Sequence, residues 1–76
     1  MAEPKYARVA NGIREQIRTG RLKPGDQLPS TAELRQLYGV GAGAVREAVM
    51  MLIREGLIVT QPGEGRYVAD PLPPST

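Results

Sequence analysis

The stretch that decides the fold covers residues 28–68 and reads LPSTAELRQLYGVGAGAVREAVMMLIREGLIVTQPGEGRYV. Near its start, Ser30 is followed three residues later by Glu33, which is the spacing of a capping box at a helix N-terminus. In that motif the serine hydroxyl accepts from the Glu33 backbone N–H, and the glutamate carboxylate accepts from the Ser30 backbone N–H. Pro29, just before the cap, disfavours backward extension, so a helix is predicted to begin after Ser30.

This helix is predicted to be short, with Leu34 and Leu37 as its apolar face and Gly39 as its end. A second helix is predicted from residue 41 or 42 to residue 55, followed by Gly56 as a stop. Its predicted buried stripe consists of Val45, Val49, Leu52 and Ile53. Because only a few residues separate the two helices, they are predicted to meet in a sharp helix-turn-helix corner.

A β-hairpin is predicted after the second of these helices. Residues 57–61 are rich in β-branched side chains, residues 62–65 read Pro-Gly-Glu-Gly, and residues 66–69 form the return strand. Two strands of this length are marginal alone, so the hairpin is predicted to pack on the helices.

The part before residue 28 predicts one further helix, over residues 6–19. Its apolar stripe is Val9, Ile13 and Ile17, and Gly20 is its predicted terminator. The connector that follows contains a Pro-Gly turn, flanked by Leu22 and Leu28, which are predicted to point inward.

Composition limits the functions open to this chain. Its 76 residues suit one domain, and it has no cysteine and no histidine, so a thiol nucleophile, an imidazole base and a Cys/His zinc site are excluded. The net charge is only +2, so any case for nucleic-acid binding depends on where the arginines lie. No apolar run approaches the roughly 20 residues of a membrane span, and a cytoplasmic location is expected.

The order of elements predicts a mainly α fold with a small β-hairpin, namely a winged helix-turn-helix of three helices plus a wing. The domain is predicted over residues 6–69, after a disordered lead at residues 1–5 and before a Pro-rich tail or linker at residues 70–76. A fold of this type binds duplex DNA.

Spaced sequence motifs run through nearly the whole predicted domain. They are Gly20-Arg21-Leu22-Lys23-Pro24-Gly25-Asp26, Leu28-Pro29-Ser30, Glu33-Leu34, Val45-Arg46-Glu47-Ala48, Leu52, Glu55-Gly56-Leu57, and Gly63-Glu64-Gly65 before Val68. This pattern resembles the DNA-binding domain of the GntR family of bacterial transcription regulators, and Tyr6 with Leu37-Tyr38-Gly39-Val40 resembles its HutC-like branch.

The resemblance implies a homodimer that binds operator DNA, usually with a C-terminal domain that senses a metabolite. Such a domain is absent from this sequence, so the chain is interpreted as either a fragment ending in its linker or a small stand-alone regulator. Neither a cofactor nor a small-molecule effector site is expected within it.

Arg46 is the strongest candidate for reading DNA bases. In this architecture the helix predicted to end at residue 55 enters the major groove by its N-terminal end, and a guanidinium can bond guanine O6 and N7 in bidentate fashion. The alternative interpretation is a surface arginine paired with Glu47 or Asp26.

The residues before Arg46 depart from the family pattern. Members commonly carry a hydroxyl residue and a basic residue after the valine at Val40, where this chain has Gly41, Ala42, Gly43 and Ala44. They also commonly carry a basic residue at the position of Ala32. One interpretation is that small residues let the helix sit deep in the groove, with Ala42 or Ala44 against a thymine methyl. The other is that sequence reading has weakened here.

Further candidates surround this helix. Gly63, Gly65 and Arg66 form a wing that would approach the minor groove or its phosphates, although Gly-Glu-Gly is equally the tip of an ordinary hairpin. Ser30 and Thr31 offer hydroxyls to a phosphate, unless Ser30 serves only as the cap. Arg35 is a candidate reader, and Lys5, Arg8 and Arg35 are possible phosphate partners or plain surface residues.

The leading hypothesis is a dimeric repressor that occupies an inverted-repeat operator. The alternative is a winged-helix protein-interaction module with weakened DNA reading. An enzyme is the least favoured class, because the carboxylates occupy capping, turn and helix-surface positions without a nucleophile or metal partner.

Overall fold

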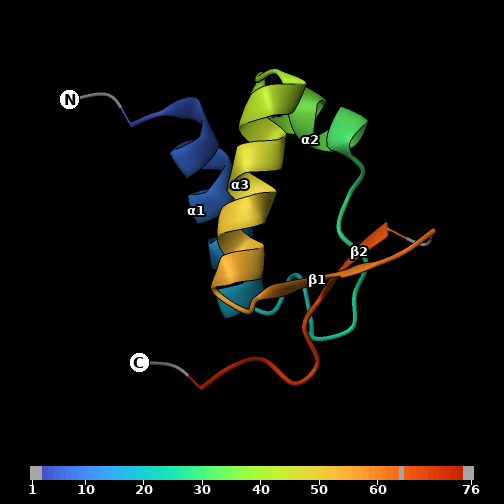
Figure 1. Cartoon of the computed structure of the whole chain (residues 1–76). Helices are drawn as coiled ribbons and strands as arrows, with labels where there is room; N and C mark the ends of the chain where they lie inside the picture. Colours follow the sequence, from blue (N-terminus) through green and yellow to red (C-terminus); the bar gives the residue numbers. More distant parts are fainter. Residues whose placement is uncertain (1–2, 64, 75–76) are drawn as a thin grey trace.

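The computed structural model describes residues 3–63 and 65–74, which form three helices and one hairpin. In chain order these are α1 (Lys5–Arg18), α2 (Thr31–Tyr38), α3 (Ala42–Arg54), β1 (Ile58–Gln61) and β2 (Gly65–Val68). Figure 1 shows α3 at the centre with α1 along one side, while the start of α2 and the hairpin reach out on the other side. The predicted class, mainly α with a small β-hairpin, is confirmed.

The ends of the elements differ from the prediction by about one residue. Helix α1 begins at Lys5, inside the predicted lead, with Pro4 as its N-cap. Just before it, Glu3 accepts a 3.0 Å hydrogen bond from the Asn11 side chain. The first two residues of the predicted lead lie outside the described residues. At the other end Thr19 caps α1, which places the helix end next to the predicted terminator, Gly20.

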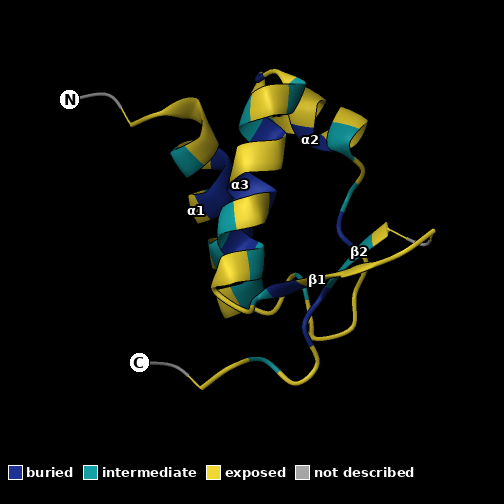
Figure 2. Cartoon of the chain, in the orientation of Figure 1, coloured by how far each residue is buried: buried dark blue, intermediate teal, exposed yellow. Residues whose placement is uncertain are grey.

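A single buried cluster holds the helices and the hairpin together. Figure 2 shows the buried positions where α1 and α3 face each other and at the base of the hairpin. The cluster consists of Val9, Ala10, Ile13, Leu28, Leu34, Val40, Val45, Ala48, Val49, Leu52, Ile58 and Val68. The predicted stripe of α3 is confirmed for three of its residues, while Ile53 is only partly buried at the cluster's edge.

Helix α2 packs differently from the prediction. Leu34 is 1% exposed, but Leu37 is 67% exposed, so the predicted apolar face was wrong at that position. The inner face instead continues from Leu34 to Tyr38, four residues later, which returns to the same side of a helix with 3.6 residues per turn. Gly12 of α1 makes room for that ring, since a Cβ there would lie 2.8 Å from Tyr38 Cε1.

The hairpin is anchored on both edges of β2. Strand β1 pairs antiparallel with β2, and the buried residues Ile58 and Val68 lie opposite each other. On its other edge, β2 bonds the connector: Leu28 donates its N–H to the Arg66 carbonyl at 2.9 Å, and Asp26 accepts from Val68 at 2.8 Å. The inward position predicted for Leu28 is confirmed, whereas the pairing of its backbone with β2 was not foreseen.

The described part of the tail, residues 70–74, forms neither helix nor strand. Leu72 is half-buried and packs against the core. The chain therefore runs back over the domain after the hairpin, and its role as a tail or linker stays a prediction.

Candidate nucleic-acid interface

Arg46 lies on the exposed side of α3, one turn before the half-exposed Met50. The core side of the helix is formed by Val45, Ala48, Val49 and Leu52. Within residues 3–63 and 65–74, the side chain of Arg46 makes no hydrogen bond or ion pair. The pairing with Asp26 or Glu47 that the sequence left open is not formed there, and the Asp26 carboxylate instead accepts from the Lys23 backbone N–H at 2.9 Å.

The first turn of α3 is bare of polar side chains. Gly41 is the N-cap with extended backbone and no side-chain cap, as the sequence indicated. Ala42 is half-buried, Gly43 is exposed, and Ala44 is half-buried against the core. The surface at this helix end thus consists of backbone and two partly accessible methyl groups.

Gly43→Ala is expected to stabilise the domain, by up to about 1 kcal/mol, because alanine loses less backbone entropy than glycine in a helix. Nothing lies within 4 Å of a Cβ built at this position, so the new methyl meets no obstacle. Thermal unfolding checks the prediction, since a domain of this size gains roughly 4–8 °C in Tm per kcal/mol.

Gly39 is the matched control. A Cβ there also meets nothing within 4 Å, but its φ of +63° lies in the left-handed region. Gly39→Ala should therefore lower Tm, because a side chain in that conformation costs about 1–2 kcal/mol. Equal shifts for the two variants would contradict this account.

The N-terminus of α2 carries the predicted capping box. Ser30 Oγ accepts from the Glu33 N–H at 3.1 Å, and Glu33 Oε1 accepts from the Ser30 N–H at 3.1 Å. The Ser30 hydroxyl still has its own proton, because accepting a bond uses only a lone pair. Capping and donation to a ligand are therefore compatible at this residue.

Arg35 is exposed on α2 and lines a surface hollow of about 290 Å³ with Ala32, Gln36 and Val40. Within the described part of the chain, the side chain of Arg35 has no hydrogen-bond or ion-pair partner. Ala32 stands where family members commonly carry a basic residue, so Arg35 is the one cation among the residues that line this hollow.

Arg66 lies in the wing and reaches the start of α2. Its Nη2 donates to Thr31 Oγ1 at 2.8 Å, and both residues are half-buried. Gly63 and Gly65 flank the tip with φ values of +76° and +105°. Glu64, between them, lies outside the described residues.

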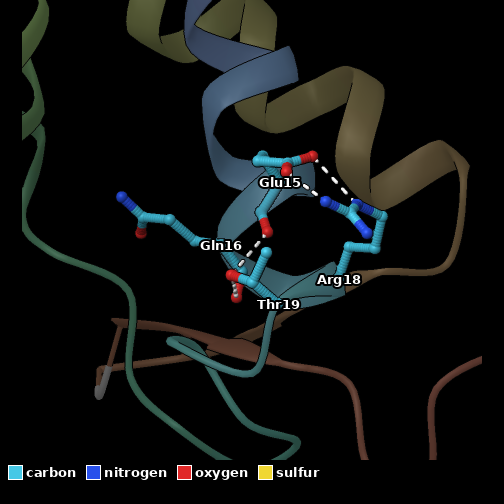
Figure 3. Close-up of polar contacts among 4 residues, drawn as sticks. All are labelled: Glu15, Gln16, Arg18 and Thr19. Carbon is cyan, nitrogen blue, oxygen red and sulfur yellow. Dashed lines mark hydrogen bonds and ion pairs between the residues drawn. The ribbon is translucent and has the colours of Figure 1, made fainter.

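Two other arginines, Arg14 and Arg18, form ion pairs away from the start of α3. Arg14 Nε donates to Glu55 Oε1 at 2.8 Å in a bidentate pair that joins α1 to the end of α3, and this bond holds the pKa of the Glu55 carboxyl below its usual range. At the end of α1, Arg18 pairs with Glu15, whose carbonyl also accepts from Thr19 Oγ1 (Figure 3). These cations are neutralised locally.

Arg8 has a structural role that the sequence did not reveal. Its guanidinium donates to the carbonyl of Tyr38, at the end of α2. The two residues lie 30 positions apart, and no local pattern links them. The phosphate contact considered for Arg8 stays a prediction, because this bond leaves other donors of its guanidinium.

The described residues contain no cluster of histidine, cysteine, aspartate or glutamate suited to hold a metal ion. None of the helices described here combines the length and apolar character that crossing a bilayer requires.

A family model described as "Bacterial regulatory proteins, gntR family" matches residues 5–68. The chain belongs to the GntR family. Among curated proteins of this kind, the mannosyl-D-glycerate transport/metabolism system repressor MngR of Escherichia coli is 40% identical over 68 residues. The histidine utilization repressor of Klebsiella aerogenes is 38% identical over the same length. Each match covers 90% of this chain but 28% of the relative, so the chain spans little more than a quarter of either protein.

Solved GntR-type structures share this fold. AraR(DBD), in complex with operator ORR3, matches with a TM-score of 0.86 and 35% identity, covering 91% of this chain and 83% of that chain. The predicted winged helix-turn-helix is therefore confirmed as a GntR-type domain. Its placement in the HutC-like branch stays a prediction.

Proposed function

We propose that this chain is the DNA-binding domain of a bacterial transcription repressor, and that it reads one half of an inverted-repeat operator. The observation that carries this proposal is Arg46, exposed on α3 with no side-chain partner among the described residues, in a fold closely similar to AraR(DBD) in complex with an operator. The relatives named as repressors support the direction of regulation. The domain would act in the cytoplasm, without a cofactor and without catalysis.

In this proposal α3 enters the major groove by its bare N-terminal turn. Arg46 bonds a guanine edge in bidentate fashion, and Ala42, with Ala44 to a lesser extent, contacts thymine methyl groups. Gly43 lets the helix backbone approach the bases. Exposed Arg35 of α2 faces the DNA beside the hollow at Ala32.

Contacts outside the major groove position the domain. Ser30 and Thr31, at the start of α2, face the phosphate backbone, where hydroxyls and backbone N–H groups commonly bind. The wing, through Gly63, Gly65 and Arg66, lies along the neighbouring minor groove. A charged guanidinium there is favoured by the negative potential of a narrow groove.

Energetics favour a dimer on DNA. One bidentate arginine supplies about 1–3 kcal/mol of discrimination between bases. A specific site typically needs roughly 4–10 kcal/mol over random DNA. Two domains on a symmetric operator double the number of base contacts, so the proposal includes a homodimer. It includes no small-molecule effector site within this domain.

Selection of bound sequences from random duplexes tests the proposal. The expected result is an enriched inverted repeat, bound with an affinity that falls steeply as salt rises, because phosphate contacts release counterions. Failure to retard any duplex at low salt would overturn it. That outcome would favour the alternative, a protein-interaction module that kept the winged fold with a weakened reading helix at residues 41–44.

A further inference from the structure

One hydrogen bond connects the wing to the helix-turn-helix through side chains. Arg66 Nη2 donates to Thr31 Oγ1 at 2.8 Å, across 35 positions of sequence. Thr31 is the first residue of α2, and Arg66 lies within β2. The bond therefore spans two of the elements that the proposed function places on DNA.

The backbone of β2 directs the Arg66 side chain toward α2. Side chains alternate between the two faces of a strand, so Arg66 shares a face with Val68, which is 1% exposed in the core. Arg66 is two residues nearer the hairpin tip than Val68. There, this face of β2 extends beyond the buried core and reaches the start of α2. The Arg66 carbonyl also accepts from the Leu28 N–H at 2.9 Å, which fixes the strand at this residue.

The Thr31 hydroxyl holds Arg66 without neutralising it. A guanidinium has five N–H donors, and within residues 3–63 and 65–74 this bond uses one of them, which leaves the others for a ligand. Arg14 and Arg18 differ because glutamate carboxylates cancel their charge. Arg66 thus combines a fixed position with a full positive charge, as an anion-binding arginine requires.

We propose that Thr31 is a positioning residue for DNA binding, which holds the Arg66 guanidinium ready for the phosphate or minor-groove edge beside the wing. This inference rests on the proposed function and changes the part of Thr31 within it, from a direct phosphate contact to a support that acts through Arg66. Its physical basis is preorganisation: ordering a long, flexible side chain before binding removes that cost from the binding step.

A double-mutant cycle tests the inference, using Thr31→Val, Arg66→Ala and the pair, with a duplex that the wild-type chain selects. Thr31→Val removes the hydroxyl but leaves the capping box at Ser30 and Glu33 in place. We expect it to weaken binding by about two- to tenfold, the range for one side chain that must be ordered on binding. In the Arg66→Ala background it should change nothing, and Thr31→Ser should keep the wild-type affinity.

Salt dependence separates positioning from direct contact. Arg66→Ala should reduce the slope of log K against log salt by about one ion, whereas Thr31→Val should leave the slope unchanged because the charge remains. A Thr31→Val loss that persists in the Arg66→Ala background would overturn the inference, and so would wild-type affinity in Thr31→Val or in Arg66→Ala. In each of these cases the wild type still binds its duplex, so the proposed function stands; only a wild type that binds no duplex removes both.

Discussion

Leu34→Ala is expected to lower the free energy of unfolding by about 2–5 kcal/mol, through lost burial and the cavity left behind. Leu34 is 1% exposed and is the buried residue of α2, so it anchors that short helix to the core. Small domains have about 5–15 kcal/mol of stability in total, so the variant should lose a large share of it. Urea denaturation followed by circular dichroism measures the change.

Leu37→Ala provides the control for that experiment. The same substitution, in the same helix and three residues later, removes a side chain that is 67% exposed. Its effect should stay within about 0.5 kcal/mol, as for ordinary surface substitutions. Similar losses for the two variants would show that α2 packs by a different face.

The sequence predicted those features that depend on neighbouring residues. The capping box needs only Ser30 and Glu33, and both of its bonds are present. The buried stripes of α1 and α3 follow from helical periodicity, since apolar residues spaced three or four apart share a face. Each helix end was placed within about one residue for the same local reason.

The sequence did not predict features that depend on tertiary contacts. Leu37 and Tyr38 are both apolar enough for an inner face, and in the structure Tyr38 takes that position, where Gly12 of α1 leaves space for its ring. The connector before α2 likewise pairs with β2 through backbone atoms of Asp26 and Leu28. Such bonds do not depend on the type of side chain, so the sequence pattern did not indicate them.

In the candidate site, too, local features were predicted and contacts between distant residues were not. Arg46 is not part of the predicted apolar stripe of its helix, and the structure places it on the exposed side. The partners of Arg8 and Arg66 lie 30 and 35 residues away, so sequence reasoning treated both as unattached cations. Which side chains actually contact DNA stays a prediction for every residue of the interface.

Arg46→Ala is expected to remove most of the preference for the selected operator while leaving binding to random duplexes. The bidentate guanine contact proposed for this side chain accounts for about 1–3 kcal/mol of discrimination, which corresponds to roughly five- to 150-fold at each half-site. No side chain that precedes Arg46 in α3 can replace it as a donor, because residues 41–45 are glycine, alanine and valine. Competition between operator and random duplex, measured at fixed salt, gives the ratio directly.

Arg54→Ala is the matched control, because it removes the same charge from the last residue of the same helix. Both variants should lose some affinity for all duplexes, since each removes one cation from the field that attracts phosphate. Only Arg46→Ala should reduce the ratio of operator to random binding, because base reading needs a donor fork at the groove rather than net charge. If the two variants changed that ratio equally, Arg46 would contribute charge alone, and the reading of sequence would have to lie in the wing or in α2.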